Sequence, residues 1–83
     1  MEKLNTALTA EAQRAARGLL NWGVRDLAAA AGVAWTTVSQ FENGRPMRTS
    51  TAAKILEAFA AEGVDLVSDD SMTGAVLVYA RRR

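Results

Sequence analysis

"VRDLAAAAGVAWTTVSQFEN", residues 24–43, holds two short apolar patterns separated by the tripeptide GVA. Their helical spacing predicts one helix over 24–31 and a second over 35–43. Glycine readily adopts the left-handed conformation that ends a helix, and Gly32 and Gly44 follow the two segments. The apolar residues that would face inward are Leu27, Ala28, Ala31, Val38 and Phe41. The stretch therefore predicts two short helices joined by a tight turn.

Two further helices are predicted on either side of this unit. Thr9 is a suitable N-cap for a helix over 10–20, and Ser50 or Thr51 is a suitable N-cap for a helix that reaches Ala61. Apolar residues recur at helical spacing in both segments, at Ala12, Ala15, Ala16, Leu19 and Leu20 and at Ile55, Leu56, Phe59 and Ala60. Gln13 and Arg14 fall outside the apolar face of the first helix.

The composition changes after Gly63, where two β-branched segments, VDLV (64–67) and AVLVY (75–79), enclose the turn-forming sequence SDDSMTG. We expect a β-hairpin, or two strands that pair with another chain. Val76 and Val78 would lie on one face of the second strand and Leu77 and Tyr79 on the other, so both faces require burial. Because so short a chain covers only one face with its own helices, we expect a homodimer built through residues 64–80. Its interface would contain Val64, Leu66, Val76, Leu77, Val78 and Tyr79.

The residue content excludes several classes of function. The chain has 83 residues and contains neither cysteine nor histidine, which removes disulfides, the usual zinc ligands and the commonest general base. We expect no enzyme activity, no cofactor, no metal ion and no small-molecule substrate. No charged start followed by a long apolar run marks a signal peptide or a membrane span, so we expect a cytoplasmic location and no membrane partner.

The charges are segregated along the chain, although the net charge is only +1. Between residues 14 and 54 six basic residues outnumber two acidic ones, whereas the five charged residues of 57–70 are all acidic. Such a division suits a protein with one face that meets a polyanion. The terminal run Arg81–Arg83 is either a solvated tail or a non-specific phosphate clamp.

The 20-residue unit resembles the helix-turn-helix regulators of the lambda-repressor and Cro type, the Xre family. That family has a small residue at the fifth position, glycine at the ninth, and apolar residues at the fifteenth and eighteenth. Ala28, Gly32, Val38 and Phe41 occupy these positions here. Ala28 must be small because the two helices cross closely at this point.

The resemblance covers residues 9–62 and implies a mainly α fold, a four-helix lambda-repressor-like domain followed by a two-stranded β element. The chain then divides into a flexible N-terminus (1–8), a helix-turn-helix DNA-binding domain (9–62), a β-hairpin for dimerisation (63–80) and a basic tail (81–83). The implied function is that of a sequence-specific transcriptional regulator of bacterial or phage type. It would be a repressor that binds double-stranded DNA at a palindromic operator as a homodimer.

The recognition helix of such a regulator lies in the major groove and reads base edges with its first turns. By the family motif, the base contacts are expected at Trp35, Thr36, Thr37 and Gln40. Phosphate contacts are expected at Arg25, Ser39, Asn43, Arg45 and Arg48. The resemblance also implies a structural ion pair between Arg17 and Glu42. The chain departs from the family at Ala34, where a Ser or Thr cap is usual, and at Val24, where a phosphate-binding Gln is usual.

Other readings of the same residues stay open. Trp35 could complete the core or a dimer surface instead of contacting DNA. The chain could also be an antitoxin-like interaction module whose C-terminal strands bind a second protein, with DNA binding secondary. A sequence-indifferent architectural DNA binder is disfavoured by the weak basic balance.

Overall fold

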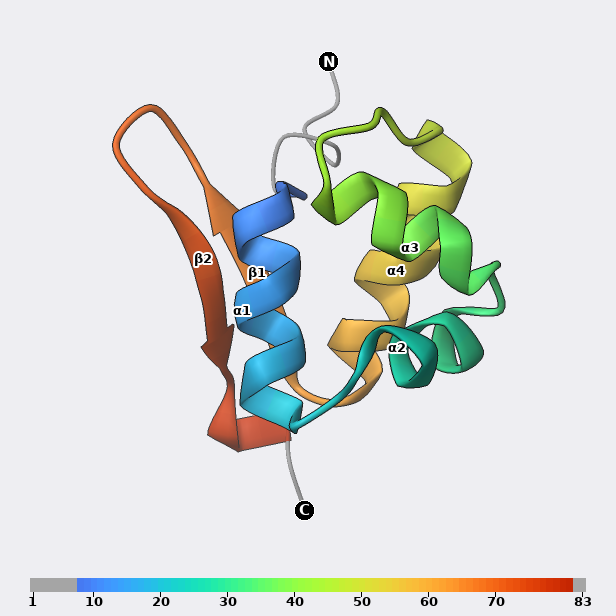
Figure 1. Cartoon of the computed structure of the whole chain (residues 1–83). Helices are drawn as coiled ribbons and strands as arrows, with labels where there is room; N and C mark the ends of the chain where they lie inside the picture. The colour runs from blue at the N-terminus through green and yellow to red at the C-terminus, as the bar shows by residue number, and fades with distance from the viewer. Residues whose placement is uncertain (1–7, 82–83) are drawn as a thin grey trace.

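The computed structural model describes residues 8–81, which form four helices and one two-stranded antiparallel sheet (Figure 1). The elements in chain order are α1 (Ala10–Leu20), α2 (Val24–Ala31), α3 (Trp35–Glu42), α4 (Thr49–Ala61), β1 (Val64–Ser68) and β2 (Thr73–Leu77), followed by the 3-10 turn η2 (Tyr79–Arg81). The protein is therefore mainly helical, as predicted. The two strands pair with each other, as the hairpin prediction requires.

Local chemistry explains where the helices begin and end. The hydroxyl of Thr9 accepts a hydrogen bond at 3.0 Å from a backbone N–H of the first turn of α1, as expected of an N-cap. Gly32 ends α2 with a φ of 72°, a left-handed conformation that glycine adopts without steric cost. The expected cap of α4 by Ser50 or Thr51 is wrong. Arg48 occupies the N-cap without a side-chain hydrogen bond, and both hydroxyl residues lie within the helix.

The core lies among the four helices, and the sheet closes one side of it. Its largest fully buried side chains are Phe59, Leu27, Ile55, Gln13, Val38 and Val64. Trp22 covers the core near Phe59, with the two rings stacked at a centroid distance of 5.9 Å and an angle of 25°. Leu8, which the sequence assigned to the N-terminal segment, is also buried in this core. Residues 1–7 of that segment, and residues 82–83 of the basic tail, lie outside the described residues.

The inward face of α1 differs from the sequence prediction. Ala12 and Ala16 are fully buried, but Ala15 is exposed and Leu19 is 41% exposed. Gln13, predicted to lie outside the apolar face, is fully buried instead. The reason is that α1 packs against the sheet and also against α3, so a polar flank of this helix is covered by another element.

Both strands of the hairpin pack against α1 (Figure 1). The register pairs Val64 with Leu77, and these side chains face the core. The strand predicted over 75–79 has the right length but is displaced by two residues, because β2 begins at Thr73. β2 ends at Leu77, Val78 donates its N–H to the carbonyl of Gly63 at 2.7 Å, and Tyr79 begins η2. Val78 and Tyr79 therefore do not alternate across a strand.

The structure divides the six residues predicted for a dimer interface. Val64 is only 1% exposed, so it is a core residue that no partner can reach. Leu66 and Leu77 pack against the core, and Val78 is half-buried. Large apolar side chains are exposed on the hairpin and just after it at Val67, Met72, Val76 and Tyr79. One face of the hairpin is therefore covered by the core, and the exposed large apolar side chains of the hairpin region are those of these four residues.

Candidate nucleic-acid interface

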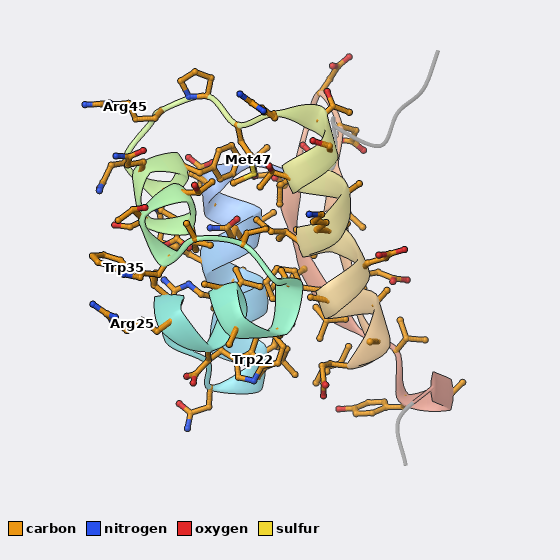
Figure 2. The ribbon with its side chains drawn as sticks, turned by 90° about the vertical axis from the view of Figure 1, so that its right-hand side faces the viewer. Trp22, Arg25, Trp35, Arg45 and Met47 are labelled. Atoms are coloured by element: carbon orange, nitrogen blue, oxygen red, sulfur yellow. The ribbon has the colours of Figure 1, made fainter. Side chains whose placement is uncertain are left out.

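One side of the molecule is formed by the start of α2, by α3 and by the loop after α3. Figure 2 shows Arg25, Trp35 and Arg45 projecting from this side, with the sheet on the opposite side of the molecule. We call this side the α3 face. Three exposed arginines, Arg25, Arg45 and Arg48, belong to it. The α3 face is thus basic, although the whole chain is nearly neutral.

The helix α3 has one inner and one outer side. Val38 is fully buried and anchors the helix to the core. Thr36 and Gln40, four residues apart and therefore on the same side of the helix, are exposed. Thr37 and Ser39 are half-buried at the margins of this strip. The outer side of α3 thus offers a hydroxyl and an amide, both neutral, which can donate and accept hydrogen bonds.

Arg25 and Trp35 are in direct contact across the α2–α3 turn. The guanidinium carbon of Arg25 lies 4.2 Å from the centre of the Trp35 ring, within the range of a cation–π interaction. Both side chains line a shallow hollow together with Gly23, Val24 and Ser39. Trp35 is 43% exposed, so it is not a core residue. The sequence identified both residues but gave no sign that they touch.

A second hollow lies on the other flank of the exposed strip of α3. Its lining residues are Thr37, Gln40, Pro46, Met47, Arg48 and Thr51. The exposed strip thus runs between two depressions, and each depression has an arginine at its margin. This arrangement brings residues from α2, α3, α4 and the connecting loop to one surface.

The loop after α3 uses its backbone N–H groups internally. The N–H of Asn43 donates to the carbonyls of Ser39 and Gln40, and the N–H of Arg45 donates to the carbonyl of Gln40 at 2.9 Å. Gly44, with a φ of 98°, donates to the carbonyl of Phe41. These three N–H groups are therefore already paired within the protein in this conformation. Asn43 and Arg45 would then bind an anion through their side chains, and both residues are exposed.

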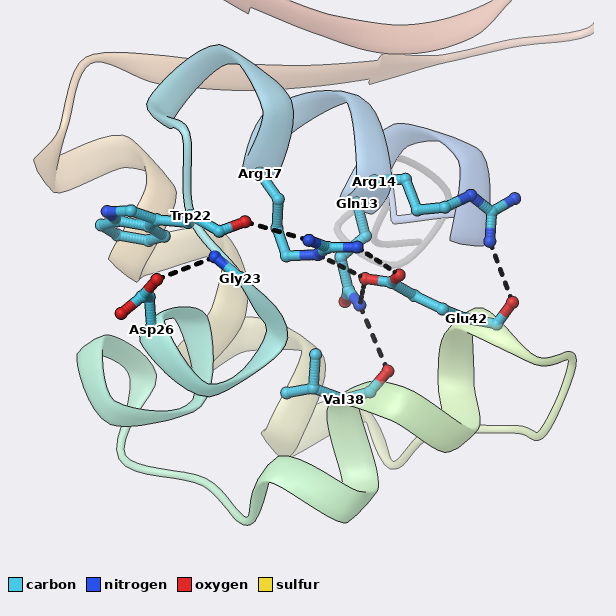
Figure 3. A network of polar contacts seen from close by, with 8 residues as sticks. All are labelled: Gln13, Arg14, Arg17, Trp22, Gly23, Asp26, Val38 and Glu42. Carbon is cyan, nitrogen blue, oxygen red and sulfur yellow. Dashed lines mark hydrogen bonds and ion pairs between the residues drawn. The ribbon is translucent and has the colours of Figure 1, made fainter.

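The position of α3 is fixed by a polar network with α1 (Figure 3). Arg17 donates from Nε and Nη2 to the two carboxylate oxygens of Glu42, at 2.9 and 2.7 Å, and from Nη1 to the carbonyl of Trp22 at 2.9 Å. Arg14 donates to the carbonyl of Glu42 at 3.0 Å. The network joins α1, the start of the α1–α2 connection and the last residue of α3.

Gln13 extends this network into the core. Its Nε2 donates to a carboxylate oxygen of Glu42 at 2.7 Å and approaches the carbonyl of Val38 at 3.4 Å. Both neighbours are acceptors, which fixes the orientation of the amide. Its Oε1 has no partner among residues 8–81. Sequence reasoning missed Gln13, because a polar residue beside an apolar face is ordinarily solvated.

The ion pair shifts the pKa of both partners. Burial raises the pKa of the Glu42 carboxyl, but the hydrogen bonds from Arg17 and Gln13 and the charges of Arg17 and Arg14 outweigh it, so the pKa lies below its usual value. The hydrogen bond to Glu42 raises the pKa of Arg17 further above its usual value, against the effect of burial. Glu42 is thus held as a charged carboxylate.

The comparisons with known proteins add no family. No family model matches the chain, and no curated protein has a significantly similar sequence. Among residues 8–81 no helix is long and apolar enough to cross a membrane. In the same part of the chain no group of three acidic side chains is placed to hold a metal ion.

Proposed function

We propose that the protein binds double-stranded DNA in a sequence-specific manner, with α2 and α3 as a helix-turn-helix unit and α3 in the major groove. The observation that carries this proposal is the α3 face: a neutral hydrogen-bonding strip on a short helix, flanked by arginines on both sides. An α-helix fits the major groove of B-DNA, where base edges present distinct donor and acceptor patterns.

Base reading would come from the exposed strip of α3. Gln40 can form two hydrogen bonds with adenine, and Thr36 can bond to a base or contact a thymine methyl group. Thr37 lies beside them at the margin. Trp35, with its ring held against Arg25, is placed to pack on a sugar or a thymine methyl group.

Phosphate binding would come from the arginines around this strip. Arg25 lies at one flank, and Arg45 and Arg48 lie in the loop at the other flank. Guanidinium groups bind phosphate with high geometric complementarity. Ser39 and Asn43 would add neutral contacts from their side chains. With α3 in the major groove, this distribution would put the positive charge beside both DNA strands.

A helix-turn-helix protein that binds DNA through one exposed helix acts most simply as a transcriptional repressor that occupies an operator. We propose that it does so in the cytoplasm of a bacterium, as a homodimer on a palindromic site and without a cofactor. Two copies would place their α3 helices about 34 Å apart, one turn of DNA. The exposed apolar set on the hairpin favours a second candidate, an antitoxin-like module that binds another protein through this surface.

The test is selection of bound duplexes from a random DNA pool by the purified protein, at about 150 mM salt so that non-specific binding is weak. An inverted repeat with a fixed spacer is the expected result. The matched control is a variant with Thr36→Ala and Gln40→Ala, which should stay folded because both residues are exposed, and should lose the enrichment. No enrichment by the folded wild-type protein would overturn DNA reading and favour the interaction module.

A further inference from the structure

The strand β2 has one edge that no other strand covers within residues 8–81. The hydrogen bond from Val78 to Gly63 and the β1–β2 register show that the even-numbered residues of β2 bond to β1. Backbone groups alternate between the two edges of a strand. The N–H and C=O groups that point to the open edge are therefore those of Thr73, Ala75 and Leu77.

We propose that two copies of this chain join along the open edge, with β2 antiparallel to β2 of the second copy and a two-fold axis at Ala75. This centre pairs Ala75 with its equivalent and Thr73 with Leu77 of the second copy, so every free group of the edge finds a partner. A centre at either neighbouring free residue leaves some of them unpaired. The proposal specifies the homodimer of the proposed function and does not depend on DNA binding.

The surface of α1 above this edge is suited to the same contact. Gln13 and Arg17 bind Glu42 and therefore mark the side of α1 that faces α3. Ala15 follows Gln13 by two residues and Leu19 follows Arg17 by two, so each lies about 200° around the helix from that side. Figure 1 shows α3 on one side of α1 and β2 on the other. The helical geometry puts Ala15 and Leu19 on the side of α1 away from α3, and thus on the flank toward the open edge. Ala15 and Leu19 are exposed, and a Cβ atom added at Gly18 would have no heavy atom within 4 Å, so the surface around Gly18 is open.

The spacing of strands makes the two α1 helices neighbours. In a continuous four-stranded sheet the centres of the two hairpins lie two strand spacings apart, about 9.6 Å. Helices pack at interaxial distances of about 8–10 Å, and small residues allow the close end of that range. Edge pairing would therefore bring the α1 flank with Ala15, Gly18 and Leu19 against the same flank of the second copy.

Charges at the two ends of β2 fit an antiparallel arrangement. The turn before β2 carries Asp69 and Asp70, and η2 after β2 ends at Arg81. Antiparallel pairing places the acidic end of one strand beside the basic end of the other, whereas parallel pairing would place like charges together. Met72, which is 59% exposed, and Tyr79 lie at the same two ends and would also meet across the interface.

The symmetry also suits binding by both copies to one DNA duplex. The two-fold axis of an antiparallel strand pair is perpendicular to the sheet. The α3 face lies on the opposite side of the molecule from the sheet (Figure 2). A rotation about an axis perpendicular to the sheet therefore leaves the α3 face of the second copy on the same side as that of the first. Both α3 faces would point in the same direction.

The first test is a disulfide at the axis, in a chain that has no cysteine of its own. Equivalent Cα atoms in a hydrogen-bonded antiparallel pair lie about 5.5 Å apart, within disulfide range. Ala75→Cys should form a covalent dimer on mild oxidation, without DNA. The matched control is Val67→Cys, because Val67 is exposed on β1, the strand that does not lie at the two-fold axis. This variant should form no covalent dimer on a non-reducing gel.

The second test is the mass of the full chain by sedimentation equilibrium. The wild-type protein should be a dimer. Ala15→Glu should weaken the dimer at least about tenfold through like charges across the axis, whereas Ala30→Glu, at an exposed alanine of α2, should not. Two results would overturn this interface if the wild-type protein is a dimer: failure of Ala75→Cys to form a disulfide, or equal dimer affinity of Ala15→Glu and Ala30→Glu. Neither result would bear on DNA binding. A monomeric wild-type protein would overturn the homodimer itself.

Discussion

Glu42 holds the guanidinium of Arg17 through both carboxylate oxygens, so the last residue of α3 is fastened to the middle of α1. Glu42→Gln should lower the free energy of unfolding by about 2–3 kcal/mol, because an amide donor would then face the donors of Arg17 and Gln13. Urea unfolding measures the change. Glu57→Gln, at an exposed site of α4, is the control and should change stability by less than about 0.5 kcal/mol. Equal values for both variants would contradict a structural role of the pair.

The same pair makes stability depend on acid pH. The pKa of Glu42 is lower in the folded protein than its usual value of 4.5, so its contribution is present above that pH and is lost as the pH falls through the folded-state pKa. The difference in unfolding free energy between wild type and Glu42→Gln should therefore shrink below about pH 4.5. Asp69 also has a lowered pKa, because Ser71 and Met72 donate hydrogen bonds to its carboxylate. Its effect on the pH dependence of stability is the same in both proteins and cancels in the difference. A difference that stays constant down to pH 3 would contradict the assignment.

Gln40 should determine sequence preference. Gln40→Ala should cost about 1–3 kcal/mol on the selected operator and much less on operators changed at the base pair that Gln40 reads. Binding measured on a panel of single base-pair substitutions would show preference relaxed at one position in each half-site. A uniform loss on every duplex would contradict direct reading by this side chain. The variant should unfold at the same urea concentration as wild type, because Gln40 is exposed.

Arg45 should contribute to affinity without sequence preference. Arg45→Gln should weaken binding to all duplexes by a similar factor and reduce the slope of log K against log salt by about one. The control is Lys54→Gln, which removes an exposed positive charge on α4, outside the α3 face. Equal salt slopes for the two variants would show that Arg45 does not contact a phosphate.

Trp35 should act on DNA partly through Arg25. The contact of 4.2 Å holds the guanidinium at one flank of α3, and its loss in Trp35→Ala should leave Arg25 free to move. A double-mutant cycle with Arg25→Ala should show a coupling of about 0.5–1 kcal/mol in DNA binding. Trp35→Phe, which retains a ring, should keep part of this coupling. Strict additivity of the two alanine variants would mean that each residue contacts DNA independently.

The sequence was most informative where local chemistry decides the structure. Apolar spacing and stop signals gave the bounds of α1 and α2 as the structure has them, and α3 differs only by its final residue. The hairpin and its turn also follow from local composition. The Arg17–Glu42 contact, by contrast, came from the family resemblance, since nothing in the spacing of two residues 25 positions apart predicts it.

The sequence was least informative where two elements cover the same residue. Gln13 is polar and lies beside the apolar stripe of α1, yet α3 buries it, and periodicity does not report a second covering element. The end of β2 depended on its partner strand, because β1 begins at Val64, opposite Leu77, while the apolar run continues beyond Leu77. The stacking of Arg25 on Trp35 likewise depended on how α2 crosses α3. All three are tertiary effects.

The position of α1 between the sheet and α3 has a consequence for operator architecture. Because α1 packs on β2 and its polar network fixes the end of α3, one helix holds both the strand edge and α3 in place. Two joined copies would then hold their helices at one distance and one rotational phase. An operator lengthened at its centre by about five base pairs, half a helical turn, would carry its second half-site to the far side of the duplex. Spacer length would thus be as strong a determinant of recognition as the bases themselves.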